Sequence, residues 1–157
     1  MPFEDLFHDL LRDVSFVEQT SAPTADAIAV QLQFTELAGN VRWDARSLEV
    51  DGAVPLVERT LKLRPEKGVA GAVEAVGEIE VDDPAIDAAW VIRGDDVALL
   101  VHMQPELRAL ADLAPSVDVA HGKVTIKFEK LDAADQNAKR ALEGALAIWH
   151  RVAFFRM

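Results

Sequence analysis

The 157-residue sequence contains no cysteine, which excludes disulfides, thiolate metal ligands and a cysteine nucleophile, and it gives no support to an oxidising compartment. Long hydrophobic segments are also missing, because the apolar run around residues 97–101 is far shorter than the about 18 residues of a spanning helix. Residues 1–5 lack the basic and then apolar regions of a signal peptide. We therefore expect a cytoplasmic protein with no membrane-inserted segment.

Sequence motifs for catalysis or nucleotide binding do not occur either. None of the four serines lies in a G-x-S-x-G or S-x-x-K context, and no G-x-G-x-x-G or G-x-x-x-x-G-K-[ST] run is present. The four histidines have no second ligand at a spacing that would repeat on one helix face. We expect no enzyme activity, and we assign no catalytic residue, metal or cofactor.

Charge of one sign dominates the chain. Its 16 Lys and Arg face 27 Asp and Glu, which gives a formal net charge of −11. Such a charge repels phosphate backbones and anionic bilayers and so disfavours nucleic-acid and membrane-surface binding. Two interpretations stay open: the acidity only keeps the protein soluble, or it attracts a basic protein partner.

Hydrophobic periodicity predicts both helices and strands. Apolar residues at helical spacing predict an amphipathic first helix over residues 3–14 and a long last helix that Asp132 caps. Alternating apolar and polar residues predict strands at 28–35, 41–46, 56–63 and 90–92, a short strand near 78–81, and a hairpin that joins 117–119 to 124–128.

Glycine and proline supply the expected breaks. Gly39-Asn40 is expected to form a turn between two strands, and Asp82-Asp83-Pro84 another. Pro105 is expected to break a helical region into a pair, from about 95 to 103 and from 105 to 113. The resulting prediction is one α+β domain over residues 1–157. It has an antiparallel sheet of about five or six strands, with the N- and C-terminal helices packed on it and a proline-broken helix pair.

Four segments in the second half of the chain form a recognisable residue pattern. They are DPAID at 83–87, WVIRGDD at 90–96, MQPELR at 103–108 and the hairpin at 117–126. With these segments the chain resembles a bacterial family of proteins of unknown function. The resemblance implies an α+β domain with no assigned activity, so it supplies no catalytic residue.

The chain departs from that family at three positions. Ile86 and Trp90 stand where phenylalanines are expected, and Gln104 stands where a capping threonine is expected. Separately, the order of helix, strands, helix, hairpin and helix is similar to that of type III secretion chaperones.

The predicted function is a non-enzymatic, acidic protein-interaction or assembly module. A homodimer through the terminal helix or a sheet edge is one form of it. The candidate partner surface consists of aromatic residues near the two ends of the sequence. They are Trp149, Phe154, Phe155, Phe3 and Phe7. An aromatic side chain that is buried within its own chain would instead belong to the core.

Two alternatives stay open at this point. The first is a chaperone-like binder of secreted or effector proteins, which exposed apolar grooves would favour. The second is a small-ligand or metal-binding protein that uses the acidic cluster near residues 78–96 together with His102. Turn formation and helix capping explain these carboxylates more simply, because their spacing does not match a calcium-binding loop.

Overall fold

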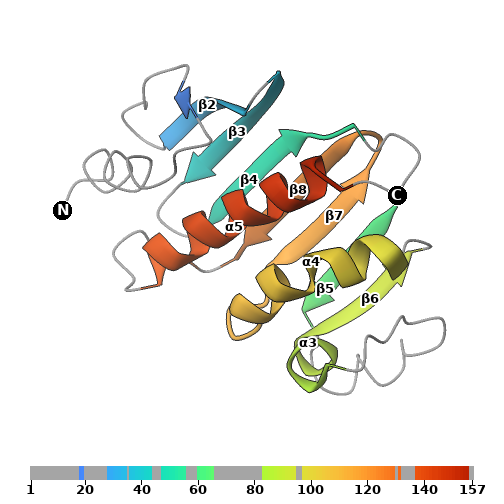
Figure 1. Cartoon of the computed structure of the whole chain (residues 1–157). Helices are drawn as coiled ribbons and strands as arrows, with labels where there is room; N and C mark the ends of the chain where they lie inside the picture. The colour runs from blue at the N-terminus through green and yellow to red at the C-terminus, as the bar shows by residue number, and fades with distance from the viewer. Residues whose placement is uncertain are drawn as a thin grey trace.

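The computed structural model describes residues 18–19, 28–34, 36–43, 47–55, 60–65, 83–94, 97–129, 131 and 137–155. Within this part, an antiparallel sheet carries its helices on one face, which confirms the α+β class (Figure 1). The sheet has eight strands in the described residues, more than the five or six expected. The predicted helix over 3–14, with Phe3 and Phe7, and the predicted strand near 78–81 lie outside these residues.

The strands run in the order β1-β2-β3-β4-β8-β7-β5-β6, and every neighbouring pair is antiparallel. Their bounds are β1 Glu18–Gln19, β2 Ile28–Phe34, β3 Leu37–Trp43, β4 Leu48–Ala53, β5 Leu61–Pro65, β6 Trp90–Gly94, β7 Ser116–Ala120 and β8 Lys123–Phe128. The hairpin β7–β8 therefore lies inside the sheet and joins the meander β1–β4 to the pair β5–β6.

Three helices lie in the described residues: α3 Pro84–Ala89, α4 Val97–Ala109 and α5 Ala138–Ala153. Helix α5 packs over β4 and β8, α4 packs beside α5, and α3 contacts α4 and β6 (Figure 1). None of these helices is long and apolar enough to cross a membrane.

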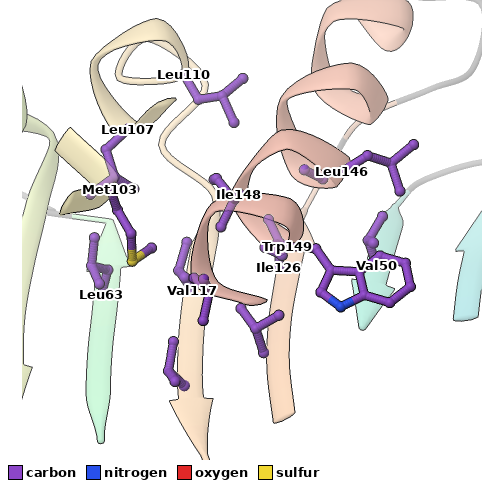
Figure 2. Packing of buried hydrophobic residues seen from close by; sticks show 14 of the residues in the cluster. Val50, Leu63, Met103, Leu107, Leu110, Val117, Ile126, Leu146, Ile148 and Trp149 are labelled. Carbon is purple, nitrogen blue, oxygen red and sulfur yellow. The ribbon is translucent and has the colours of Figure 1, made fainter. Parts of the chain in front are cut away.

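The core fills the space between these helices and the sheet. Figure 2 shows Leu146, Ile148 and Trp149 of α5 near Val50 and Ile126 of the sheet. The inner side of α5 matches the predicted seam, since the residues predicted for it within the helix are all buried. They are Ala138, Ala141, Leu142, Ala145, Trp149 and Val152.

The predicted turn at Gly39-Asn40 is wrong. Both residues lie inside β3, and Gly39 stands directly opposite Gly52 of β4. A Cβ atom on Gly39 would lie 2.7 Å from the Trp149 Cη2 atom, and one on Gly52 would also overlap the indole. Trp149 donates a hydrogen bond of 2.9 Å from Nε1 to the Ala53 carbonyl. The two glycines are thus a cross-strand pair that leaves room for a tryptophan side chain.

The predicted break at Pro105 is also absent, because α4 continues through this residue to Ala109. Proline cannot donate to the carbonyl four residues earlier, which belongs to Val101. Val101 has 53% of its surface exposed and Pro105 is exposed too, so water can reach this side of the helix. The helix tolerates the proline because the lost bond lies on its solvent side.

Of the two other predicted turns, one begins a helix and one joins two strands. The predicted turn at Asp83-Pro84 begins α3: Asp83 caps the helix by accepting a 3.1 Å hydrogen bond from the Ala85 amide, and Pro84 takes its first position. The predicted hairpin β7–β8 is confirmed, with His121 at φ 54° and Gly122 at φ 73° as its two turn residues. Positive φ at both positions is the geometry of a type I′ turn.

Candidate functional site

The described aromatic residues of the predicted partner surface are mostly core residues. Trp149 is fully buried, and Phe155 is 6% exposed with its ring 5.1 Å from that of His102. Phe154 alone of these three is exposed, at 47%, and its ring lies 4.8 Å from the His150 ring. Trp149 and Phe155 are therefore corrected to core positions, because the helices and the sheet of the same chain cover them.

Asp83 is the one buried residue of the predicted acidic cluster in the described part. Its Oδ2 accepts hydrogen bonds of 3.2 Å from Gln104 Nε2 and 2.8 Å from Arg108 Nε. The Gln104 hydrogen bond, followed by that of Arg108, lowers the pKa of Asp83 below its ordinary value. This carboxylate links α3 to α4, which is a structural role. Asp87 lies in α3 and is partly buried, and the members at 78, 80, 82, 95 and 96 lie outside the described residues.

His102 lies elsewhere on α4, beside the C-terminal aromatic residues. Four residues further on, Glu106 accepts a 2.8 Å hydrogen bond from Arg151 Nε of α5. Burial, and then Arg151, lower the pKa of His150, which directly precedes Arg151 on α5. The structure does not bring Asp83 and His102 to one site, and no group of three possible metal ligands occurs among the described residues.

The two faces of the sheet differ sharply in polarity. Side chains that point to the helices are apolar and buried, as at Leu48, Val50, Val124 and Ile126. Their neighbours point the other way, where no described helix lies (Figure 1). We call this second surface the open face and define it by its charged residues in strands β3 to β8, which the strand register places on one side. They are Arg42, Glu49, Asp51, Lys62, Arg64, Arg93, Asp118, Lys123 and Lys127.

The open face is cationic although the chain is acidic. Among the described residues of strands β3 to β8, it holds six Lys and Arg but three Asp and Glu. Two of its carboxylates already have cationic partners within the face: Asp118 bonds Arg64, and Asp51 lies 3.9 Å from Lys123. The local charge therefore has the opposite sign to the net charge of −11.

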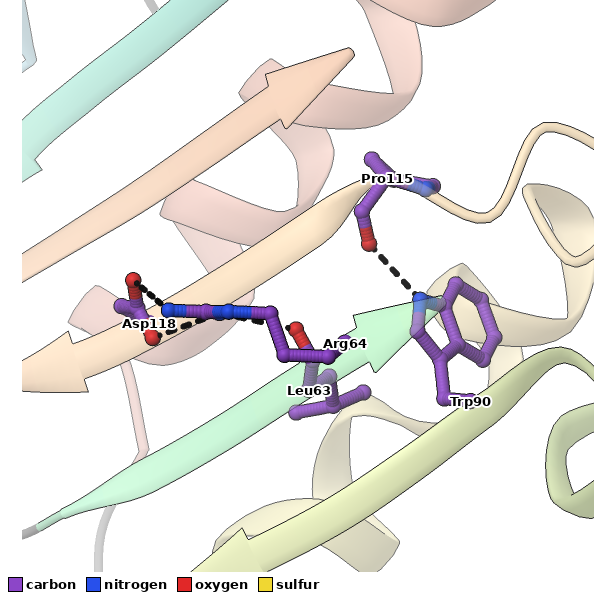
Figure 3. A network of polar contacts seen from close by, with 5 residues as sticks. All are labelled: Leu63, Arg64, Trp90, Pro115 and Asp118. Atoms are coloured by element: carbon purple, nitrogen blue, oxygen red, sulfur yellow. Dashed lines mark hydrogen bonds and ion pairs between the residues drawn. The ribbon is translucent and has the colours of Figure 1, made fainter. Parts of the chain in front are cut away.

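Arg64 binds Asp118 with both guanidinium arms. Nη1 to Oδ1 and Nη2 to Oδ2 each measure 2.9 Å, and Nη1 also donates to the Leu63 carbonyl at 3.0 Å (Figure 3). Both side chains are about two-fifths exposed, so the pair adds little to stability but holds the two groups in a fixed orientation. Nearby, Trp90 Nε1 donates a 2.7 Å hydrogen bond to the Pro115 carbonyl and so links β6 to the start of β7.

A cleft of about 400 Å³ opens at this end of the sheet, along β5, β6 and β7. Lys62 and Arg93 stand directly opposite each other in the register there, and both are exposed. Gly94 has φ 137°, and a Cβ atom on it would lie 2.6 Å from the Thr60 carbonyl oxygen. The lining residues are Thr60, Leu61, Lys62, Arg93, Gly94, Asp118, Val119 and Ala120.

A second hollow of about 320 Å³ lies over β2 and β3, and its described lining residues are uncharged. It is lined by Gln31, Leu32, Gln33, Ala38, Gly39 and Asn40. The sequence interpretation missed both hollows and the open face. The alternation of charged with buried residues along the strands could have predicted the open face, as it does at Lys62, Arg64, Lys123 and Lys127.

No protein-family model matches the chain, and no match is found among curated proteins. Among solved structures, the chain is similar to the crystal structure of the mycobacterial trehalose monomycolate transport factor A, TtfA. The TM-score is 0.46 and the sequence identity 10%, over 98% of each chain. A similarity of this degree supports no inference about function, and the resemblances predicted from the sequence stay predictions.

Proposed function

We propose that this protein is a non-enzymatic binding module whose protein partner docks on the open face of the sheet. The observation that carries the proposal is that buried apolar side chains alternate with charged side chains along the same strands. One set of side chains packs under α4 and α5, while the alternate set carries six cations, five of them exposed, against three anions in β3 to β8. An extended and charged surface suits a polypeptide better than a small molecule.

The charge of this face favours an acidic partner over the basic partner that the net charge suggests. Electrostatic attraction falls off over about 8 Å at physiological ionic strength. Six strands, from β3 to β6 across the sheet, span about 24 Å at their usual spacing of about 4.8 Å. A segment that lies on the open face therefore experiences mainly the charges within this distance, and the described charges of β3 to β8 are more often cationic than anionic.

A nucleic acid fits this surface less well than a short acidic polypeptide. A polyanion that extends beyond the sheet meets an acidic protein surface and is repelled there, because the whole chain carries −11. A polypeptide segment with a few carboxylates can end where the cationic face ends. We therefore assign the partner as an acidic stretch of protein.

The homodimer and the chaperone-like function stay predictions. Dimerisation through the seam of α5 has little support, because the residues of that seam are buried against the chain's own sheet and α4. Pairing through a sheet edge is the version to test, by sedimentation over a range of protein concentrations. Either form is compatible with a partner on the open face.

Binding of a fluorescent decapeptide with alternating glutamates, followed by anisotropy, tests the proposal. The variant Lys127→Glu changes the open face, and Lys139→Glu makes the same charge change on the outer side of α5, where Lys139 lies 3.9 Å from Glu143. We expect Lys127→Glu to weaken binding by about threefold or more at low salt and Lys139→Glu by less than about twofold. Failure of the wild type to bind, or equal losses in both variants, would contradict the proposal.

A further inference from the structure

We propose that residues 3–14 form an amphipathic helix that packs on the helix-covered face of β2 and β3 and closes the core there. This surface lies on the side of the sheet opposite to the open face, so the inference is independent of the proposed function. It gives an apolar surface a named occupant within the same chain. It also makes Phe3 and Phe7 core residues instead of members of the candidate partner surface.

The first support is the burial of β2 and β3 on this face. Leu32 of β2 is 1% exposed, and Val41 and Trp43 of β3 are 0% and 1% exposed. Among the described residues, helices pack mainly on β4, β6 and β8, and α5 extends toward β3 with the Trp149 indole above Gly39 (Figure 1). Leu32 pairs with Gly39 from the outer side, one strand beyond the indole. Burial this complete indicates apolar cover in addition to the described helices.

The second support is the composition of the segments that could supply this cover. Residues 20–27 are TSAPTADA, residues 44–46 are DAR and residues 132–136 are DAADQ, so these segments hold no apolar side chain larger than proline. Residues 56–59 connect β4 to β5, and residues 66–82 connect β5 to α3. In the strand order, β5 lies beyond β8 and β7, on the side of β4 that faces away from β2. These two connections therefore lead away from the surface.

Residues 3–14 have the side chains that this surface needs. Their apolar members are spaced at i, i+3, i+4, i+7, i+8 and i+11, which places them along one side of a helix. A helix of this length measures about 18 Å, and strand β3 measures about 24 Å, so one helix can cover most of the strand. The apolar members are Phe3, Leu6, Phe7, Leu10, Leu11 and Val14.

The third support is the short connection from this segment to the sheet. Glu18 begins β1 and pairs with Gln33 of β2. The chain from Val14 to Glu18 spans at most about 14 Å when it is fully extended. At about 4.8 Å per strand, this distance reaches over β2 and β3 but not to β7, which lies about 24 Å from β1. The end of the segment is therefore held close to the surface that it is proposed to cover.

The polar side of the helix then faces solvent. It carries the carboxylates of Glu4, Asp5, Asp9 and Asp13 against the guanidinium of Arg12. The helix side of the molecule thereby gains negative charge, whereas the described charges of the open face are more often cationic. The two sides of the sheet therefore differ in charge as well as in polarity.

A nitroxide spin label in the full chain tests this placement by NMR. The chain has no cysteine, so a single introduced cysteine carries the label. Glu36→Cys places it at an exposed position of the β2–β3 turn, toward which the chain leads from Glu18, and Lys62→Cys places it at an exposed position of β5. We expect the label at residue 36 to remove most of the amide signal of residues 10–14. The label at residue 62 should leave that signal largely unchanged.

Two matched substitutions test the contact by amide hydrogen exchange. Leu10→Asp puts a carboxylate on the apolar side of the segment, and His8→Asp puts the same group on the polar side. We expect exchange at residues 32, 41 and 43 to become about tenfold faster or more with Leu10→Asp, and to change by less than about twofold with His8→Asp.

The outcomes decide between the possible occupants of the surface. Full signal at residues 10–14 with the label at residue 36, or equal losses from both label positions, would overturn the proposal. A loss of signal in isotope-labelled chains mixed with separate nitroxide-carrying chains would identify a second copy as the occupant and overturn it too. Equal exchange rates in the two aspartate variants would contradict the contact. If Leu10→Asp unfolds the whole chain, the spin-label result decides alone.

Discussion

The helix-covered face and the open face are built from alternate residues of the same strands, yet they place different demands on the sequence. In β8, Val124 and Ile126 are fully buried under α5, while Lys123 before them and Lys127 after them are exposed. Truncating a buried side chain leaves a cavity, whereas exposed positions usually change stability by less than about 0.5 kcal/mol. The covered face therefore contributes most of the stability, and the open face can change with little effect on it.

The largest test of this difference is Trp149→Ala. Removing the indole empties the space above Gly39 and Gly52 and breaks the hydrogen bond to Ala53, so we expect the free energy of unfolding to fall by about 3–5 kcal/mol. Phe154→Ala removes an aromatic ring that is half exposed, and its loss should stay below about 1 kcal/mol. Urea unfolding of both variants makes the comparison. Similar losses would show that Trp149 is not the core residue described here.

The second test adds a methyl group instead of removing a ring. Gly52→Ala places its Cβ against the Trp149 indole, so we expect a loss of about 1–3 kcal/mol. The control is Ala38→Val, which enlarges an exposed residue of the neighbouring strand β3 on the other face and should cost less than about 0.5 kcal/mol. If Gly52→Ala were as stable as the wild type in urea, the close approach of Trp149 to the sheet would be wrong.

The third and smallest test concerns a charge in the helix layer. Because the pKa of Asp83 is lowered in the folded state, the ionised carboxylate stabilises the fold above its ordinary value of 3.8. This contribution disappears as the pH falls through the lower pKa of the folded state. We expect Asp83→Asn to lower the thermal midpoint at pH 7, and the difference from the wild type to shrink below about pH 4. A difference that stayed constant with pH would contradict the assigned contacts with Gln104 and Arg108.

Elements whose pattern is local could be predicted from the sequence. The alternation in β2 and in the hairpin β7–β8, and the helical spacing in α5, follow from one buried side per element, and the structure confirms each of them. The Asp83-Pro84 pair carried a signal for the start of α3 that was interpreted as a turn only.

Features that depend on distant residues could not be predicted in this way. Gly39 resembles a turn glycine until Trp149 is known to lie above it. Strand β4 was missed because Gly52, which also lies under Trp149, interrupts the alternation of apolar residues. Pro105 is tolerated because of its position on the outer side of α4, which the sequence does not state. The cleft needs the register that sets Lys62 opposite Arg93, and no local pattern contains it.

The insertion of β7 and β8 into the middle of the sheet also governs the order in which the chain can fold during synthesis. Strands β2 to β4 leave the ribosome first, but the strand that pairs with β4 and the tryptophan that covers its glycine come from residues 123–149. Until those residues emerge, the nascent chain holds an unprotected apolar surface and an unpaired strand. Folding of this half of the sheet can therefore be completed only after α5 has been synthesised.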